Sequence, residues 1–346
     1  MESFNIPVVL FFFKRKETTL QIIEQLSYIK PCKIYLISDG PRHESEKPQI
    51  IDCRKAVEAS INWECEIIKN YAEHNKGVYD RIGKGASWVL SKEEKAIFLE
   101  DDNLPELTFF EYCSELLEKY KHDTRILWIC GTNYLEEFKP DDGSSYVFTK
   151  HLMPCGWASW SNKFNKFYDG DMELLKDKKI LKKLKNEYAD KKLYRQQVRS
   201  IISEYNKLIF EGKPTSWDFQ MALTIRANNL FGISPMYNQI ENIGVDEFSI
   251  HGGTTMNNPM TKRFCSIKTS KLTFPLKHPN SVMIDSIYEK RVGKIILYPL
   301  SMRIDLAIKE SLSRILRNIF NIQPNESVRK VLSRKIRITY KSKWKK

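Results

Sequence analysis

The first 135 residues alternate between short apolar runs and amphipathic segments. Runs typical of buried β-strands occupy residues 6–13 (IPVVLFFF), 33–40 (KIYLISDG), 64–70 (ECEIIKN), 95–102 (KAIFLEDD) and 125–134 (RILWICGTNY). Between the first two runs, Leu20, Ile23 and Leu26 recur at the spacing of one helix face, and residues 75–90 also favour a helix. This alternation predicts an α/β, Rossmann-like fold with a mostly parallel sheet flanked by helices.

The carboxyl ends of parallel strands meet at one edge of a sheet, where ligands of such folds bind. Polar clusters follow three of the expected strands, at residues 14–16 (KRK), 38–42 (SDGPR) and 100–102 (EDD). After the acids, Asn103 is expected to cap a helix that has Pro105 in its first turn. The sequence therefore predicts one site at this edge.

The acidic cluster is Glu100, Asp101 and Asp102. Three adjacent carboxylates repel one another at the end of a buried strand unless a positive group lies between them. A divalent ion, Mn²⁺ or Mg²⁺, fits this position, with one carboxylate as direct ligand and water and phosphate oxygens as the others. A solvated acidic turn is the alternative.

Charged residues at the ends of the first two strands are candidates for binding a nucleotide. Lys14, Arg15 and Arg42 could hold a diphosphate, and Asp39 could accept a pyrimidine imide N–H or a sugar hydroxyl. Charged loop ends are the alternative for all of them.

Three further cations, Lys76, Arg81 and Lys84, lie in the segment NKGVYDRIGKGASW. Its glycines do not follow the order of a phosphate-binding P-loop, and the segment does not follow the first strand. The cations stay candidate donor contacts, with an exposed helix face as the alternative.

Two later residues are candidates for catalysis or binding. Asp218 follows Trp217 at an expected helix start, where an apolar wall would raise the pKa of the carboxyl and suit it to general-base work. His251 precedes two glycines and could bind phosphate or complete the metal shell, although a lone histidine near a turn is more often a surface or core residue.

Charge and composition narrow the class of protein. The net charge of +13 comes almost entirely from residues 291–346, which contain 15 Lys or Arg against 3 Asp or Glu, so basicity is a property of the tail. The seven cysteines show no C-x-x-C spacing, which favours a reducing, cytoplasmic compartment. The apolar start of the chain is too short to span a bilayer.

Three segments are expected along the chain. Residues 1–135 form a donor-binding α/β half, residues 136–265 an acceptor-binding and catalytic half, and residues 266–346 a basic helical extension. Within the second half, residues 171–211 are typical of a charged amphipathic helix in two pieces.

The combination resembles nucleotide-sugar glycosyltransferases of the GT-A fold, and more narrowly the N-acetylglucosaminyltransferase I group and its bacterial relatives. The segments that carry the resemblance are EDDNLPELTFFEYCSELLEKY, LWICGTNY, MPCGWASW, SWDFQ and ENIGVDEFSIHGG, in this order. It covers roughly residues 5–255.

This resemblance implies roles for individual residues. Asp102 would bind the metal directly, and Glu100 and Asp101 would contact metal-bound water or the ribose. Arg15 and His251 would meet the diphosphate, and Asp39 the uracil of a UDP-sugar.

The same resemblance implies an inverting transfer of sugar to a glycan or lipid-linked acceptor, with Asp218 removing the proton from the acceptor hydroxyl. In the family two consecutive acids follow the Trp, whereas Phe219 follows Asp218 here, so the base is uncertain by one position. Asp246 and Glu247 are next in line.

Two other functions are compatible with the sequence. A sugar-nucleotide nucleotidyltransferase also places acids at strand ends, but it would carry a glycine-rich loop after the first strand, and FFFKRKETTL contains no glycine. A non-enzymatic nucleic-acid-binding protein could use the basic tail, but the tail has no recognised motif and few aromatic residues, so no nucleic acid is expected as a partner.

The tail also suggests a membrane surface as a partner. In LAIKESLSRILRNIF, Leu306, Ile308, Leu312, Ile315, Leu316, Ile319 and Phe320 are expected largely on one side of a helix. Such a helix, with basic residues at its margins, is typical of peripheral attachment to the anionic cytoplasmic face of a membrane, where envelope polysaccharides are built on lipid carriers. A solvated basic helix is the alternative.

Overall fold

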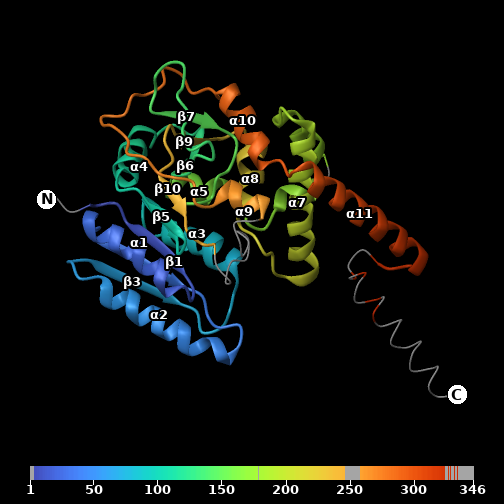
Figure 1. The fold of residues 1–346 in the computed structure, drawn as a ribbon, viewed down its shortest axis with the longest axis horizontal. Coiled ribbons are helices and arrows are strands. Elements are labelled where there is room, and N and C mark those ends of the chain that lie inside the picture. Colours follow the sequence, from blue (N-terminus) through green and yellow to red (C-terminus); the bar gives the residue numbers. More distant parts are fainter. Residues whose placement is uncertain are drawn as a thin grey trace.

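The computed structural model describes residues 4–177, 179–245 and 258–323, together with residues 326, 328, 331 and 333. At its centre is an eight-stranded sheet (Figure 1). In spatial order its strands are β3 (Glu66–Tyr71), β2 (Lys33–Ser38), β1 (Val8–Phe12), β4 (Lys95–Glu100), β8 (Trp157–Trp160), β6 (Ile126–Cys130), β9 (Phe231–Pro235) and β7 (Tyr146–Thr149). Only β8 and β7 run antiparallel to their neighbours in this sheet. The prediction of an α/β fold with a mostly parallel sheet is confirmed.

A second, two-stranded sheet consists of β5 (Asn103–Pro105) and β10 (Ile240–Asn242), which pair antiparallel. The α-helices are α1 (Lys16–Ile29), α2 (Lys47–Ser60), α3 (Gly85–Leu90), α4 (Thr108–Lys119), α5 (Ser161–Phe167), α6 (Ile180–Leu184), α7 (Lys191–Glu211), α8 (Asp218–Ala227), α9 (Pro259–Phe264), α10 (Ser286–Ile296) and α11 (Leu300–Phe320). A π-helical turn, η2 (Tyr79–Lys84), leads into α3.

The two faces of the sheet are buried in two separate apolar clusters, because alternate residues of a strand point to opposite faces. Val8 and Leu10 of β1 lie in the cluster that includes Leu26 of α1 and Leu116 of α4. Val9, between them, lies in the other cluster, with residues of α3, α5, α8 and α10. Helices therefore cover both faces of the sheet.

Stacked aromatic rings fill the centre of the second cluster. Trp157 of β8 stacks on Phe98 of β4 at 3.9 Å between ring centroids and on Trp128 of β6 at 4.1 Å. Its ring also lies 5.6 Å from that of Trp217, the residue before α8. This stack joins the middle of the sheet to the start of the helix that carries Asp218.

Three local expectations differ from the structure. No helix was expected after the second strand, but α2 forms there, with Pro48 in its first turn and Ile50, Cys53 and Val57 on its buried side. Residues 136–170, for which the sequence predicts no strand, contribute β7 and the inserted strand β8. Asn103 does not cap a helix, because it begins β5, and α4 begins only at Thr108.

The C-terminal segment divides into a packed part and a projecting part. Leu272 and Leu276 are buried in the core, and Tyr288 and Val292 of α10 pack into the second cluster. In contrast, α11 extends away from the body of the molecule and has no buried residue (Figure 1). Of the helical extension expected over residues 266–346, the part before α11 packs on the body of the protein, and α11 projects from it.

We expect Trp157→Ala to lower the free energy of unfolding by about 3–5 kcal/mol, because it empties the centre of the aromatic stack. Trp157→Phe should cost less, since it keeps one stacked ring. Urea unfolding at equilibrium measures both losses, and equal stability of the alanine variant and the wild type would contradict the packing role.

Candidate functional site

A tight turn after β4 presents the acidic triplet, and Asn103 holds that turn. The Asn103 Oδ1 accepts the backbone N–H groups of Glu100 (3.3 Å) and Gly156 (2.9 Å), and its Nδ2 donates to Asp102 Oδ1 (2.7 Å). The side chain is 1% exposed. Asn103 therefore ties the triplet to the Gly-Trp segment that begins β8.

The small sheet brings a distant segment against Asp102. Pairing of β5 with β10 places Asn242 opposite Asn103, and the N–H of Ile243 donates to the Asp102 carbonyl at 2.9 Å. A methyl group on Gly244 would lie 2.4 Å from Asp102 Oδ2. Position 244 thus requires glycine, because any side chain would displace the Asp102 carboxylate.

Arg15 supplies positive charge to the triplet. Its Nη1 lies 3.1 Å from Asp102 Oδ2 and 3.4 Å from Asp101 Oδ1. Asp101 Oδ2 also accepts the N–H of Phe13 at 3.0 Å. These contacts form because β1 and β4 are neighbours in the sheet, so the segment after β1 lies beside the end of β4.

One guanidinium does not offset the crowding of the carboxylates. Burial, together with the charge of Asp102, raises the pKa of Asp101 to about 7, although Arg15 and the Phe13 N–H act in the opposite direction. Burial raises the pKa of Glu100 well above its ordinary value, and the charges of Asp102, Asp101 and Asp218 add to this increase. The triplet therefore lies in a strongly negative environment, and Asp218 is close enough to contribute to it.

Asp218 begins α8, as the sequence predicted. Ser216 donates its hydroxyl to Asp218 Oδ1, and the Ser216 Oγ accepts the Phe219 N–H at 3.3 Å. The Trp217 ring is 3% exposed and packs into the aromatic stack. The charge of Asp218 contributes to the raised pKa values of Tyr134 and Tyr168, which are due first to burial.

The loop before Asp218 is held by Glu204 of α7. The Glu204 carboxylate, 4% exposed, accepts the N–H groups of Thr215 (2.7 Å) and Ser216 (3.0 Å) and the Thr215 hydroxyl (3.0 Å). Lys207 adds an ion pair at 2.6 Å. Sequence reasoning missed this residue because a glutamate on a charged helix looks like an exposed one.

Asp39 has a structural role at the end of β2. Its Oδ1 accepts the N–H groups of Gly40 and Lys76, and its Oδ2 accepts the Gly77 N–H and the Asn75 Nδ2, all at 2.8 Å. A carboxylate offers about four acceptor positions, and all are used. Direct binding of a uracil by Asp39 would require one of these hydrogen bonds to break.

The remaining predicted donor contacts lie at the ends of β2 and β3. Lys76 is exposed on the loop that Asp39 holds. Arg81 is 8% exposed and donates to the Asn70 carbonyl and, at 3.1 Å, to Asn70 Oδ1, while its Nε has no hydrogen-bond partner among the described residues. Burial lowers the pKa of Arg81. Among the described residues, Lys76 and Arg81 form no hydrogen bond or ion pair with the acidic triplet.

Three candidates, His251, Asp246 and Glu247, lie outside the described residues. Within the described ranges, no group of three or more His, Cys, Asp or Glu side chains is arranged to hold a metal ion. The donor set at the triplet nevertheless fits a hard divalent cation, because it consists of carboxylate oxygens. The pKa values of Glu100 and Asp101 are raised first by burial and then by the neighbouring carboxylates, and a cation would counter both effects.

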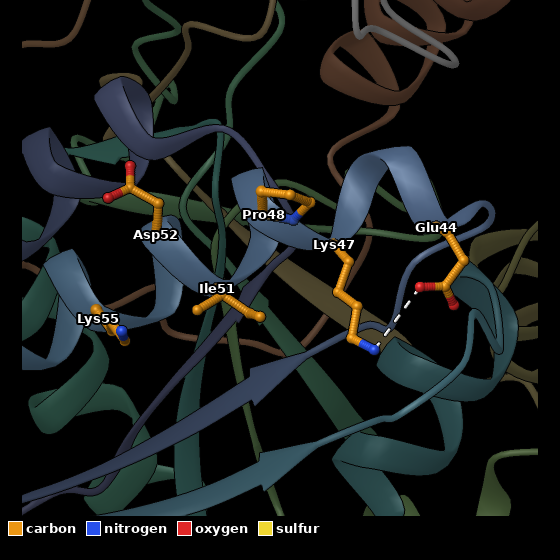
Figure 2. Close-up of a pocket in the computed structure, with 6 residues that line it drawn as sticks. All are labelled: Glu44, Lys47, Pro48, Ile51, Asp52 and Lys55. Atoms are coloured by element: carbon orange, nitrogen blue, oxygen red, sulfur yellow. Dashed lines mark ion pairs between the residues drawn. The ribbon is translucent and has the colours of Figure 1, made fainter.

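One surface hollow of the described residues lies away from the triplet. Figure 2 shows six residues along one side of α2 and the turn before it, with an ion pair of 3.7 Å between Glu44 and Lys47. No residue of the triplet lines this hollow, nor does Asp218. A shallow depression lined by one stretch of chain, residues 44–55, lacks the convergent polar groups of a reaction site.

Comparisons with known proteins give only distant likenesses. No protein-family model and no curated protein matches the sequence. Among solved structures, a UDP-glucose pyrophosphorylase complexed with UDP-glucose has a TM-score of 0.34 and 10% identity, over 69% of this chain and 94% of that chain.

An apo UDP-glucose pyrophosphorylase has a TM-score of 0.34 and 12% identity, over 69% of this chain and 93% of that one. A 4-diphosphocytidyl-2C-methyl-D-erythritol synthase from Anaerococcus prevotii has a TM-score of 0.30 and 9% identity, over 48% and 75% of the two chains. Likeness at this level does not decide which reaction the chain performs.

We expect Glu204→Gln to loosen the loop before Asp218, because an amide cannot accept hydrogen bonds at both ends and would place its NH₂ against a donor. The free energy of unfolding should fall by about 1–3 kcal/mol. Hydrogen exchange of the Thr215 and Ser216 amides should accelerate by a larger factor than the loss in free energy of global unfolding predicts. Glu211→Gln, on the exposed end of the same helix, is the matched control.

Proposed function

We propose that this protein is a metal-dependent glycosyltransferase that moves a sugar from a nucleotide sugar to an acceptor hydroxyl. The observation that carries the proposal is the convergence of Glu100, Asp101 and Asp102 with Arg15 and Asp218 at the carboxyl edge of the sheet. These groups supply a site for a cation bound to a diphosphate and, facing it, a carboxylate able to take a proton.

The donor side of the proposed site uses Asp102 as the direct ligand of Mn²⁺ or Mg²⁺. When bound, such an ion offsets the negative charge that develops on a departing nucleoside diphosphate. Arg15 can turn from the carboxylates to the diphosphate once a cation has replaced it as their counter-charge. The donor is proposed to be a UDP-sugar, with Lys76, Arg81 and His251 as further contacts.

The acceptor side uses Asp218 as the general base. A sugar hydroxyl must lose its proton as it attacks, so a carboxylate within reach of the reacting carbon accelerates transfer. Attack from the face opposite the diphosphate inverts the sugar carbon, and no covalent intermediate on the protein is needed. Asp39 then acts as a positioning residue, because its hydrogen bonds hold the 75–77 loop.

Sugar-nucleotide nucleotidyl transfer is the second candidate. The solved structures compared above are named for enzymes of this kind, so the comparisons point to it rather than to glycosyl transfer. In that reaction the nucleophile is a phosphate, which is already ionised and needs no base. A carboxylate such as Asp218 facing the triplet would repel it.

The segment after β1 also bears on the choice between the two reactions. Only Phe13, Lys14 and Arg15 separate β1 from α1, and none is glycine. The Phe13 N–H donates its hydrogen bond to Asp101, so it is not available to a nucleoside triphosphate. These two facts support glycosyl transfer.

One pair of assays separates the candidates. The purified protein is incubated with a panel of UDP-sugars and Mn²⁺, with release of nucleoside diphosphate as the readout, and separately with UTP and sugar 1-phosphates, with release of pyrophosphate. Diphosphate release from one UDP-sugar supports the proposal. Pyrophosphate release alone would replace it with the nucleotidyltransferase.

We expect Asp102→Asn to abolish the stabilisation that UDP and Mn²⁺ together give, because the carboxylate links the metal to the diphosphate. At ligand about a hundredfold above Kd the wild type should gain about 2–3 kcal/mol of stability, and the variant none. Thermal unfolding with and without a chelator measures the gain.

The matched control for this variant is Asp141→Asn, which removes the charge of an exposed loop acid. It should keep the full stabilisation. An unchanged response in Asp102→Asn, or an equal response in the presence of the chelator, would remove the metal from the site.

We expect Asp218→Asn to lower kcat by roughly 10²-fold or more while donor affinity is kept, because the base acts only in the transition state. Ser216→Ala, which keeps the carboxylate but removes its hydroxyl contact, should lose much less. Steady-state kinetics with donor titration separates kcat from binding. Loss of donor binding with normal turnover of the bound complex would assign the base to another residue.

A further inference from the structure

The helix α11 exposes an apolar face that nothing in the described part of the chain covers. Six of its apolar residues are between 51% and 66% exposed: Leu300, Ile304, Ile308, Leu312, Ile315 and Ile319. Successive members are four residues apart, except that Ile315 follows Leu312 by three. At 100° per residue they form one broad stripe along the whole helix.

The structure corrects the face expected from the sequence. Leu316 is only half-exposed and, four residues after Leu312, lies beside the edge of the stripe. Leu306 and Phe320 are also half-exposed, and helical geometry places them on the opposite side. Glu310, on this opposite side, forms an ion pair of 2.5 Å with Arg199 of α7. The body of the protein therefore holds α11 by its other side, and the stripe faces away from α7.

Basic residues border the stripe and follow it. The helix contains four Lys or Arg against two acids, and both acids are paired within the protein, Asp305 with Lys309 (2.7 Å) and Glu310 with Arg199. The sequence after the helix, residues 321–346, adds nine Lys or Arg and one acid, with Tyr340 and Trp344. The positive charge complements an anionic surface.

The dimensions and spacing of the stripe favour a planar apolar surface over a helical partner. A two-helix seam needs apolar residues that alternate at intervals of three and four. This alternation holds only from Ile308 to Ile319, whereas three successive intervals of four, from Leu300 to Leu312, turn the stripe around the helix and widen it. None of the described helices is long and apolar enough to cross a bilayer. A helix of about 30 Å with a wide apolar side and basic margins matches one that lies in a lipid headgroup region.

We propose that α11 docks this protein onto the surface of an anionic lipid bilayer, with the stripe of Leu300, Ile304, Ile308, Leu312, Ile315 and Ile319 inserted among the headgroups. Arg314, at a margin of the stripe, then lies at the level of the lipid phosphates. The proposal is independent of the proposed reaction, since it rests on residues outside the acidic site.

The test is co-sedimentation of the full-length protein with vesicles of phosphatidylcholine alone and of phosphatidylcholine with about 30% phosphatidylglycerol. The wild type should bind the anionic vesicles at low salt and dissociate largely at about 0.5 M salt. The double variant Ile308→Gln and Ile315→Gln removes apolar area without changing charge. We expect it to bind at least about tenfold more weakly.

The control double variant, Ile209→Gln and Met283→Gln, removes exposed apolar side chains of α7 and of the segment before α10. It should bind as the wild type does. Both variants should fold normally, because the substituted residues are exposed, and circular dichroism checks this.

Three outcomes would overturn the proposal. The first is no sedimentation of the wild type with anionic vesicles, and the second is equal binding of the two double variants. The third is conversion of a dimer into a monomer by the α11 variant in light scattering, without any change in vesicle binding, which would assign the stripe to a second copy of the chain.

Discussion

The crowding of carboxylates around Arg15 is the constraint on which the rest of the structure depends. Burying the triplet at the end of β4 costs free energy unless counter-charge and hydrogen-bond donors surround it. Adjacent strands β1 and β4 allow Arg15 and the Phe13 N–H to reach the acids, and Asn103 fixes their turn. The pKa values of Glu100 and Asp101 are nevertheless raised, first by burial and then by the neighbouring carboxylates, so this compensation is partial. A divalent cation would supply the counter-charge that lets the three acids ionise together.

A second set of contacts positions Asp218 from the opposite side. The aromatic stack fixes Trp217 against the middle of the sheet, and Glu204 fixes the loop that precedes it. Buried carboxylates that accept several backbone N–H groups are well-defined anchors, because each donor restricts one more direction of movement. Two independent anchors therefore hold a half-buried carboxylate near enough for its charge to act on Glu100.

Much of the fold and part of the site could be predicted from the sequence. Short apolar runs identified β1, β2, β3, β4 and β6, but not β9, which runs parallel to β6. Strand-end position led to the prediction that Arg15 and the triplet lie at one edge, and the structure places them in contact. The strand beginning at Asn103 was missed because Asn and Pro at a loop-helix boundary give the same local signal as a cap. The inserted strand β8 was missed because its pairing partners are remote in sequence. Glu204 and the full hydrogen bonding of Asp39 depend on tertiary contacts, which composition and spacing do not encode.

The pairing of β5 with β10 has a consequence for how the protein is made. The strands β1 to β4 and their helices form from the first 100 residues through short connections, so they can fold early during synthesis. Asn103, however, can pair with Asn242 only after that residue has left the ribosome, 139 residues later. Until then Asp102 lacks the segment that packs against it. At the usual rate of synthesis the nascent chain therefore keeps the acidic turn without its second strand for roughly ten seconds, a period in which cellular cations and chaperones have access to the turn.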